Sequence, residues 1–102
     1  MGLLKKRKKL DNPEVLARIN SRAIKYVTTR NSDGTEYVLG HSGSINIKND
    51  ELICHADGKD VFRCNIYEAK VGELLSKDGV RLSYTKEDGS EYSVIAYYVY
   101  RR

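Results

Sequence analysis

Four Asp-Gly dipeptides, at positions 33–34, 57–58, 78–79 and 88–89, divide most of this chain into short segments. Asp-Gly suits the positive φ angles of tight hairpin turns, so each dipeptide is a predicted chain reversal. Between them, after about residue 24, apolar and polar residues alternate with the period of a half-buried strand. This pattern constrains the chain to an antiparallel β-sheet with short connections.

The alternation predicts strands near residues 24–31, 35–40, 43–49, 51–57, 60–67, 70–76, 79–86 and 91–101, with further turns at 41–44 and 48–50. The eight Tyr residues agree with this interpretation, because Tyr favours pleated, half-buried surfaces. We therefore predict a mainly β (α+β) fold. Its architecture is an antiparallel meander of seven to eight short strands, curled into a small barrel or a sandwich.

The last hairpin gives a specific prediction of register. If Asp88 and Gly89 are its two turn residues, apolar residues face apolar residues and a Lys faces a Glu. The predicted pairs are Lys86 with Glu91, Tyr84 with Ser93, Leu82 with Ile95 and Val80 with Tyr97.

A helical period precedes the strands. Asn12 suits the N-cap position, Pro13 the first helical position and Glu14 the first turn. Apolar residues then fall on one arc at helical spacing: Val15, Leu16, Ile19 and Ala23. We predict one N-terminal amphipathic helix over about residues 12–24, with its apolar arc on the sheet and a cationic ridge towards solvent.

Positive charge is concentrated at the N-terminus. Residues 1–30 carry nine Lys or Arg and two acidic residues, whereas residues 31–102 carry nine and twelve. The 102 residues suffice for one modest core, so we predict a basic flexible arm over residues 1–10 and a single domain over residues 11–102. The arm shows no secretory signal and no apolar run of membrane-spanning length, which favours the cytoplasm.

Both cysteines and one of the two histidines lie between Ile53 and Cys64, the one cluster that suggests reactive chemistry. The alternation points Cys54 and Cys64 into the core and His55 away from it. The spacing lacks the paired ligands of a zinc site and the adjacent base of a thiol nucleophile. We therefore expect buried thiols, no catalytic, cofactor-binding or metal-binding residues, and a protein that is not an enzyme.

The register of the two cysteines stays open. A three-residue loop at 58–60 would set Cys54 directly opposite Cys64, which a disulfide requires. A two-residue turn at Asp57 and Gly58 would instead break the match between the apolar faces of the two strands. In a reducing cytoplasm both residues are expected as thiols.

A pattern of strand and turn residues resembles small bacterial domains with a pleckstrin-homology or GRAM-like fold. It comprises Gly43-Ser44-Ile45-Asn46-Ile47-Lys48-Asn49, Leu52-Ile53, Phe62, Ile66, Gly79-Val80-Arg81-Leu82 and Gly89-Ser90-Glu91-Tyr92. The resemblance covers about residues 43–95 and implies a seven-stranded, strongly bent sheet that binds proteins, peptides or lipids. That family closes its barrel with a C-terminal helix, which this pattern lacks, so no lipid-binding residue carries over.

These patterns favour a non-catalytic interaction module without a cofactor. It would bind a protein or peptide through an exposed sheet edge or the tyrosine-rich last strand, with Tyr98 and Tyr100 as contact residues; the competing expectation is that the N-terminal helix covers this strand. Homodimerisation is a further option. The alternative is peripheral association with an anionic membrane, or nucleic-acid binding, through Lys5, Lys6, Arg7, Lys8, Lys9, Arg18 and Arg22.

Overall fold

A computed structural model of the chain describes residues 10–31 and 33–99. In this part of the chain, one helix precedes seven strands: α1 (Pro13–Ile19), β1 (Arg22–Arg30), β2 (Glu36–Lys48), β3 (Glu51–Ala56), β4 (Lys59–Asn65), β5 (Lys70–Glu73), β6 (Gly79–Thr85) and β7 (Glu91–Tyr98). All strand pairs are antiparallel and form one sheet in the order β4-β3-β2-β1-β7-β6-β5. The mainly β, antiparallel prediction is confirmed, and the sheet is not closed into a barrel.

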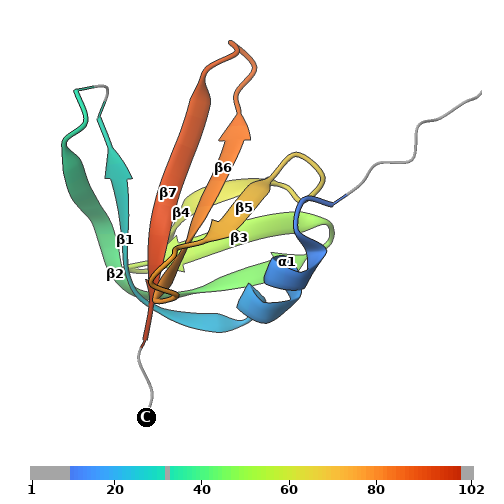
Figure 1. Ribbon diagram of the computed structural model, residues 1–102, viewed down its shortest axis with the longest axis horizontal. Helices are drawn as coiled ribbons and strands as arrows, with labels where there is room; N and C mark the ends of the chain where they lie inside the picture. Colours follow the sequence, from blue (N-terminus) through green and yellow to red (C-terminus); the bar gives the residue numbers. More distant parts are fainter. Residues whose placement is uncertain (1–9, 32, 100–102) are drawn as a thin grey trace, which may run out of the picture.

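The sheet is strongly bent, so that β3 and β4 lie across from β5 and β6, with α1 at one end (Figure 1). Aromatic rings from the two sides meet inside the bend. The centroid of the Phe62 ring of β4 lies 5.5 Å from that of Tyr84 of β6 and 6.1 Å from that of Tyr92 of β7. The Tyr92 hydroxyl also donates to the Val61 carbonyl oxygen over 3.0 Å. These contacts hold the two halves of the sheet together without strand pairing.

The concave side of the sheet, called the inner face below, encloses one hydrophobic core. The core comprises Val15, Leu16, Ile19, Ile24, Val27, Ile45, Leu52, Cys54, Ala56, Phe62, Cys64, Ile66, Ala69, Val71, Val80, Leu82, Val94, Ala96 and Tyr98. The three helical members confirm most of the predicted apolar arc. The opposite, convex side is called the outer face.

The helix is shorter than predicted. It ends at Ile19, because Asn20 is extended and Ser21 has a φ of 67°. The Ser21 N–H then donates to Ile45 O over 2.7 Å, and the Asn20 side chain accepts from the Ile47 N–H over 2.9 Å. These bonds to β2 replace the next helical turn, so Ala23 lies exposed in β1 instead of on the helical arc.

The predicted turn at residues 41–44 is wrong. The chain continues through it as one 13-residue strand, β2, with a local change of direction where Ser42 has a φ of 47°. Gly43 allows β2 to press against β3, because a Cβ atom there would lie 1.6 Å from His55 O. The predicted turn at 48–50 is confirmed, since Lys48 pairs with Glu51 across it.

The hairpin with the two cysteines has a two-residue turn, in which Asp57 and Gly58 have φ angles of 53° and 76°. A bulge between Cys54 and His55 then shifts the register by one residue. The bulge restores the match of apolar faces that the short turn alone was expected to break. Cys54 faces Phe62, Cys64 faces Leu52, and both cysteines are free thiols.

The other Asp-Gly dipeptides differ in detail. The reversal at Asp88-Gly89 is confirmed, but its loop has three residues, with Lys86 N–H donating to Ser90 O over 2.7 Å. The observed partners are therefore displaced by one residue from the predicted ones, with Tyr84 facing Tyr92 and Leu82 facing Val94. The chain also reverses between β5 and β6, but through loop 74–78 rather than through a two-residue turn at Asp78-Gly79. Gly79 begins β6, and its missing Cβ avoids an approach of 2.8 Å to Ala96 O.

Candidate binding surface

Two of the predicted anionic-surface residues, Arg18 and Arg22, lie in the part of the chain that the structure describes. Lys5, Lys6, Arg7, Lys8 and Lys9, like Tyr100, lie outside the described residues. Arg18 lies on α1, whereas Arg22 begins β1. Both cations have partners: the Arg18 guanidinium donates to Glu73 Oε1 over 2.7 Å, and that of Arg22 stacks 3.9 Å above the Tyr98 ring.

Tyr98 does not lie on an open surface. Its side chain is only 4% exposed, and its hydroxyl donates to Glu73 Oε2 over 3.2 Å. Burial raises the pKa of Tyr98 to about 12, while the hydrogen bond from Arg18 lowers the pKa of Glu73. The prediction that Tyr98 contacts a partner is therefore corrected. The alternation of β7 turns Tyr98 to the inner face, and Arg22 covers its ring.

The two sheet edges are partly occupied. At β5, the Val71 N–H donates to Asp11 Oδ2 over 3.0 Å, and Asn12 Nδ2 donates to Val71 O over 2.8 Å. The two side chains thus bind both outward-facing backbone groups of Val71, as a neighbouring strand would. Asn12 makes no side-chain cap bond to the helix. At β4, the Tyr92 hydroxyl donates to Val61 O. Each edge strand thus has at least one backbone group that is already hydrogen-bonded to a side chain.

The two thiols face the core, as expected. Burial raises the pKa of Cys54 to about 12 and that of Cys64 to about 11. Because the thiolate is the nucleophilic form, both residues are poor nucleophiles near neutral pH. His55 lies on the outer face, where its Nδ1 is 3.0 Å from Asp60 Oδ1. Among the described residues no group of three or more His, Cys, Asp or Glu side chains is placed to hold a metal ion.

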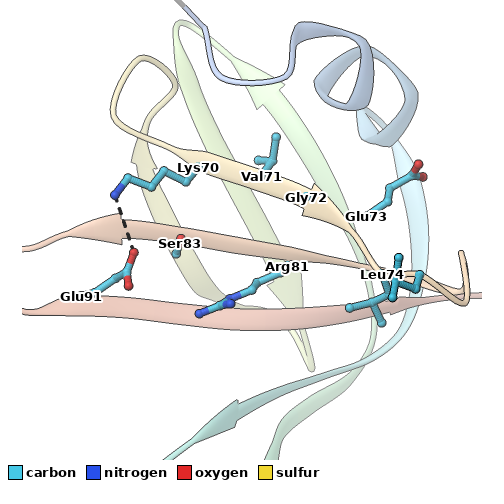
Figure 2. Close-up of a pocket in the computed structure, with 9 residues that line it drawn as sticks. Lys70, Val71, Gly72, Glu73, Leu74, Arg81, Ser83 and Glu91 are labelled. Atoms are coloured by element: carbon cyan, nitrogen blue, oxygen red, sulfur yellow. Dashed lines mark ion pairs between the residues drawn. The ribbon is translucent and has the colours of Figure 1, made fainter.

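The outer face of β5, β6 and β7 is hollowed. We call this hollow the outer groove; Gly72, Leu74, Arg81, Ser83, Ser93 and Ile95 line it. Arg81 and Leu74 border both of its parts, the larger of which has a volume of about 560 Å³. Figure 2 shows the Arg81 side chain lying across the floor, with Leu74 at one end and the Lys70–Glu91 pair at the other.

Charges around the outer groove are unequally paired. Lys70 Nζ lies 3.8 Å from Glu91 Oε2, and Glu73 is bound by Arg18. Arg81 is exposed and makes no ion pair with any residue in 10–31 or 33–99. The groove therefore offers one guanidinium whose five N–H donors are available to a ligand.

An aromatic row continues the surface beyond the groove. On the outer face, Tyr97 of β7 stacks on Tyr26 of β1 with 4.7 Å between ring centroids, and His41 of β2 lies 6.4 Å beyond Tyr26. The Tyr97 hydroxyl is 3.4 Å from Glu36 Oε2. Desolvation raises the pKa of Tyr97. The tyrosine of β7 that faces outwards is therefore Tyr97, not Tyr98.

Sequence reasoning missed Gly72, Arg81 and Ile95 as candidates for binding. The alternation did contain a signal for Arg81, since it lies between the core residues Val80 and Leu82 and must point outwards. The one-residue error in the β6–β7 register placed Leu82, rather than Arg81, opposite Ile95. The two residues that form the centre of the groove were thus not recognised as neighbours.

Comparisons with protein-family models, curated proteins and solved structures give no significant match. In the described part of the chain, α1 is too short and too polar to cross a membrane.

Proposed function

We propose that this chain is a non-catalytic interaction module that binds an extended segment of a partner protein across the outer face of β5, β6 and β7. The observation that carries the proposal is the outer groove, which joins half-buried Ile95 to Leu74 and Arg81. An arginine beside aliphatic side chains is a combination found in protein interfaces, where Arg is enriched and apolar side chains are buried. The proposal keeps the tyrosine-rich strand as the binding element and changes the face that it uses.

Two further features support a surface site over a buried one. The core thiols are held protonated by burial, which disfavours them as nucleophiles. The helix packs on the inner side, where Val15, Leu16 and Ile19 join the core, and Figure 1 shows the outer side of β6 and β7 without a covering helix. A partner can therefore approach this face without displacing any described element.

The alternative through the basic arm has less support from the described residues. Arg18 and Arg22, its two described members, are bound to Glu73 and stacked on Tyr98. Binding an anionic polymer or lipid through them would have to compete with these contacts. The peptide-binding proposal needs no such exchange, since Arg81 and Ile95 are accessible as they stand.

The experiment is to pan a random peptide library displayed on phage against the immobilised full-length protein. Enriched peptides are then measured against Ile95→Lys, which puts a charge in the groove, and against Ile53→Lys. Ile53 is a matched control because it is also a half-buried isoleucine on the outer face, but of β3 on the other side of the bend.

Peptides that bind the wild type and Ile53→Lys, and lose affinity for Ile95→Lys, support the proposal. It is overturned if no peptide is enriched, or if the enriched peptides bind both variants as well as the wild type. Sedimentation with anionic vesicles and binding to single-stranded RNA provide the comparison with the alternative. Tight binding of either, unaffected by Ile95→Lys, would favour the arm instead.

A further inference from the structure

The glycines of the described residues fall into groups with different structural reasons. Gly34, Gly58 and Gly89 have positive φ angles in turns. At Gly40, Gly43 and Gly79, an added Cβ atom would come within 3.0 Å of a neighbour. Glycine is therefore favoured at the first three positions by the backbone conformation and at the other three by the lack of room for a Cβ atom.

Gly72 is the exception among them. Its φ is not positive, an added Cβ atom would meet nothing within 4 Å, and the β5–β6 register is continuous through it. Glycine weakens a strand interior, and where it is kept it often marks a bulge, a tight bend or the close approach of a ligand. The regular register argues against a bulge and the open space argues against the close approach of another backbone, so of these reasons the approach of a ligand remains.

The empty space above Gly72 lies beside Arg81. The two residues are direct partners in the β5–β6 ladder, and both line the larger part of the outer groove (Figure 2). A side chain at position 72 would project into this part of the groove, on the β5 side of Arg81, whose own side chain extends from β6 towards β7 in Figure 2. Its absence leaves Arg81 open to a group that enters from solvent.

The charge balance of the groove specifies what that group is. Glu91 is paired with Lys70, and Glu73 with Arg18, so Arg81 is the single cation of the lining that no described residue neutralises. One guanidinium matches one carboxylate in bidentate geometry. Glu73 and Glu91 lie in the same lining, so a phosphate dianion would meet more repulsion there than a singly charged carboxylate.

Resting on the proposed function, we infer that the notch between Gly72 and Arg81 anchors the partner by one carboxylate, with an adjacent apolar side chain packed against Leu74 and Ile95. Arg81 holds the carboxylate, Gly72 provides the space, and Leu74 and Ile95 provide the apolar wall. An acidic residue next to an aliphatic one is thus the expected signature of the partner's bound segment.

The test uses a small probe that does not depend on finding the partner. N-acetyl-leucine carries one carboxylate beside one aliphatic side chain, and its primary amide is the neutral control. Each is titrated into the ¹⁵N-labelled full-length protein, and amide shifts of Gly72 and Ser83 and the Nε–H signal of Arg81 are followed by NMR. Inorganic phosphate is titrated in parallel.

We expect N-acetyl-leucine to shift these signals and the amide to shift them little. Arg81→Gln should weaken binding of the acid at least about tenfold, because hydrogen bonds to charged groups are the strong ones. Arg63→Gln is the matched control, since Arg63 is an outer-face arginine already bound to Glu51 and Asp60. Gly72→Leu should block the site in a folded protein, because position 72 has open space.

The inference is overturned if the amide or phosphate shifts the same signals as strongly as the acid, if no signal moves, or if Arg81→Gln and Gly72→Leu both bind like the wild type. Dispersed spectra establish that each variant is folded, and the two variants test the same point independently. Library peptides that lose affinity for Ile95→Lys but bind Arg81→Gln like the wild type would contradict the carboxylate anchor and leave the proposed function standing. A library without enriched peptides would contradict the proposed function instead.

Discussion

Two neighbouring residues of one strand, Tyr97 and Tyr98, show how differently the two faces of this sheet are organised. Tyr98 lies on the inner face, 4% exposed, with its hydroxyl on Glu73 and its ring under Arg22. Tyr97 lies on the outer face, stacked on Tyr26 and two residues along β7 from Ile95 of the groove. Among the described residues, the inner face is closely packed and its buried polar side chains have partners, whereas on the outer face Arg81 makes no ion pair and the groove is unfilled. Stability should depend on the first face and binding on the second.

The largest expected effect separates the two tyrosines. Tyr98→Ala removes a buried ring and should lower the free energy of unfolding by about 3–5 kcal/mol, whereas Tyr97→Ala removes a partly exposed stacked ring and should cost about 1 kcal/mol. Urea denaturation monitored by circular dichroism measures both. Tyr98→Phe keeps the ring and serves as the control for the hydroxyl. Equal losses for the two alanine variants would show that the faces do not differ as described.

Thiol protection tests the inner face by a second route. At a pH below the pKa, each unit by which the pKa rises lowers the thiolate fraction tenfold. The pKa rises from 9.0 to about 12 at Cys54 and to about 11 at Cys64, so alkylation should slow about 1000-fold and about 100-fold. The rates are measured by mass spectrometry on native and urea-unfolded protein. Rapid native labelling of Cys54 would contradict its place in the core.

Two glycines sharpen the comparison further. Gly43→Ala places a Cβ atom against His55 O and should cost about 1–3 kcal/mol in unfolding free energy. Gly72→Ala fills open space in a strand and should increase stability by up to about 1 kcal/mol. Thermal unfolding of both variants beside the wild type measures the difference. If Gly72→Ala destabilises the fold, then Gly72 has a structural role and the argument for a ligand notch weakens.

A change in pH dependence is expected at Tyr98, confined to strongly alkaline pH. The pKa of Tyr98 is raised from 10.0 to about 12, so the folded state keeps the phenol protonated where the unfolded chain has lost the proton. This contribution is fully present below pH 10 and is lost as the pH rises through about 12. Tyr98→Phe should therefore show a shallower loss of stability over that range. A slope identical to that of the wild type would contradict the buried, protonated phenol.

Much of the fold could be predicted from the sequence because it depends on local chemistry. The alternation of apolar residues predicted the strands, and Pro13 and the arc of Val15, Leu16 and Ile19 predicted the start and the buried side of the helix. Asp57-Gly58 and Asp88-Gly89 were correctly predicted to reverse the chain. The resemblance to pleckstrin-homology or GRAM-like domains stays a prediction.

The errors have two physical causes, which are contacts with other elements and irregularities within single hairpins. The helix ends early because Ser21 and Asn20 bind β2. A bulge beside Cys54 and an extra loop residue before Gly89 each shift a register by one position, and turn sequence alone does not specify either. These shifts decide which side chains become neighbours.

The sequence by itself determined that the chain forms an antiparallel β-sheet preceded by one helix, and that Cys54 and Cys64 face its core. The tertiary structure decided which tyrosine of β7 is covered, which arginine keeps an open guanidinium and which glycine has empty space around it. Burial alternates along a strand and can be predicted from the strand itself. Whether a charged side chain has a partner, and whether space beside a residue is filled, depends on the neighbouring strands. Gly72 and Arg81 could therefore be recognised as neighbours only once the order of β5, β6 and β7 was known.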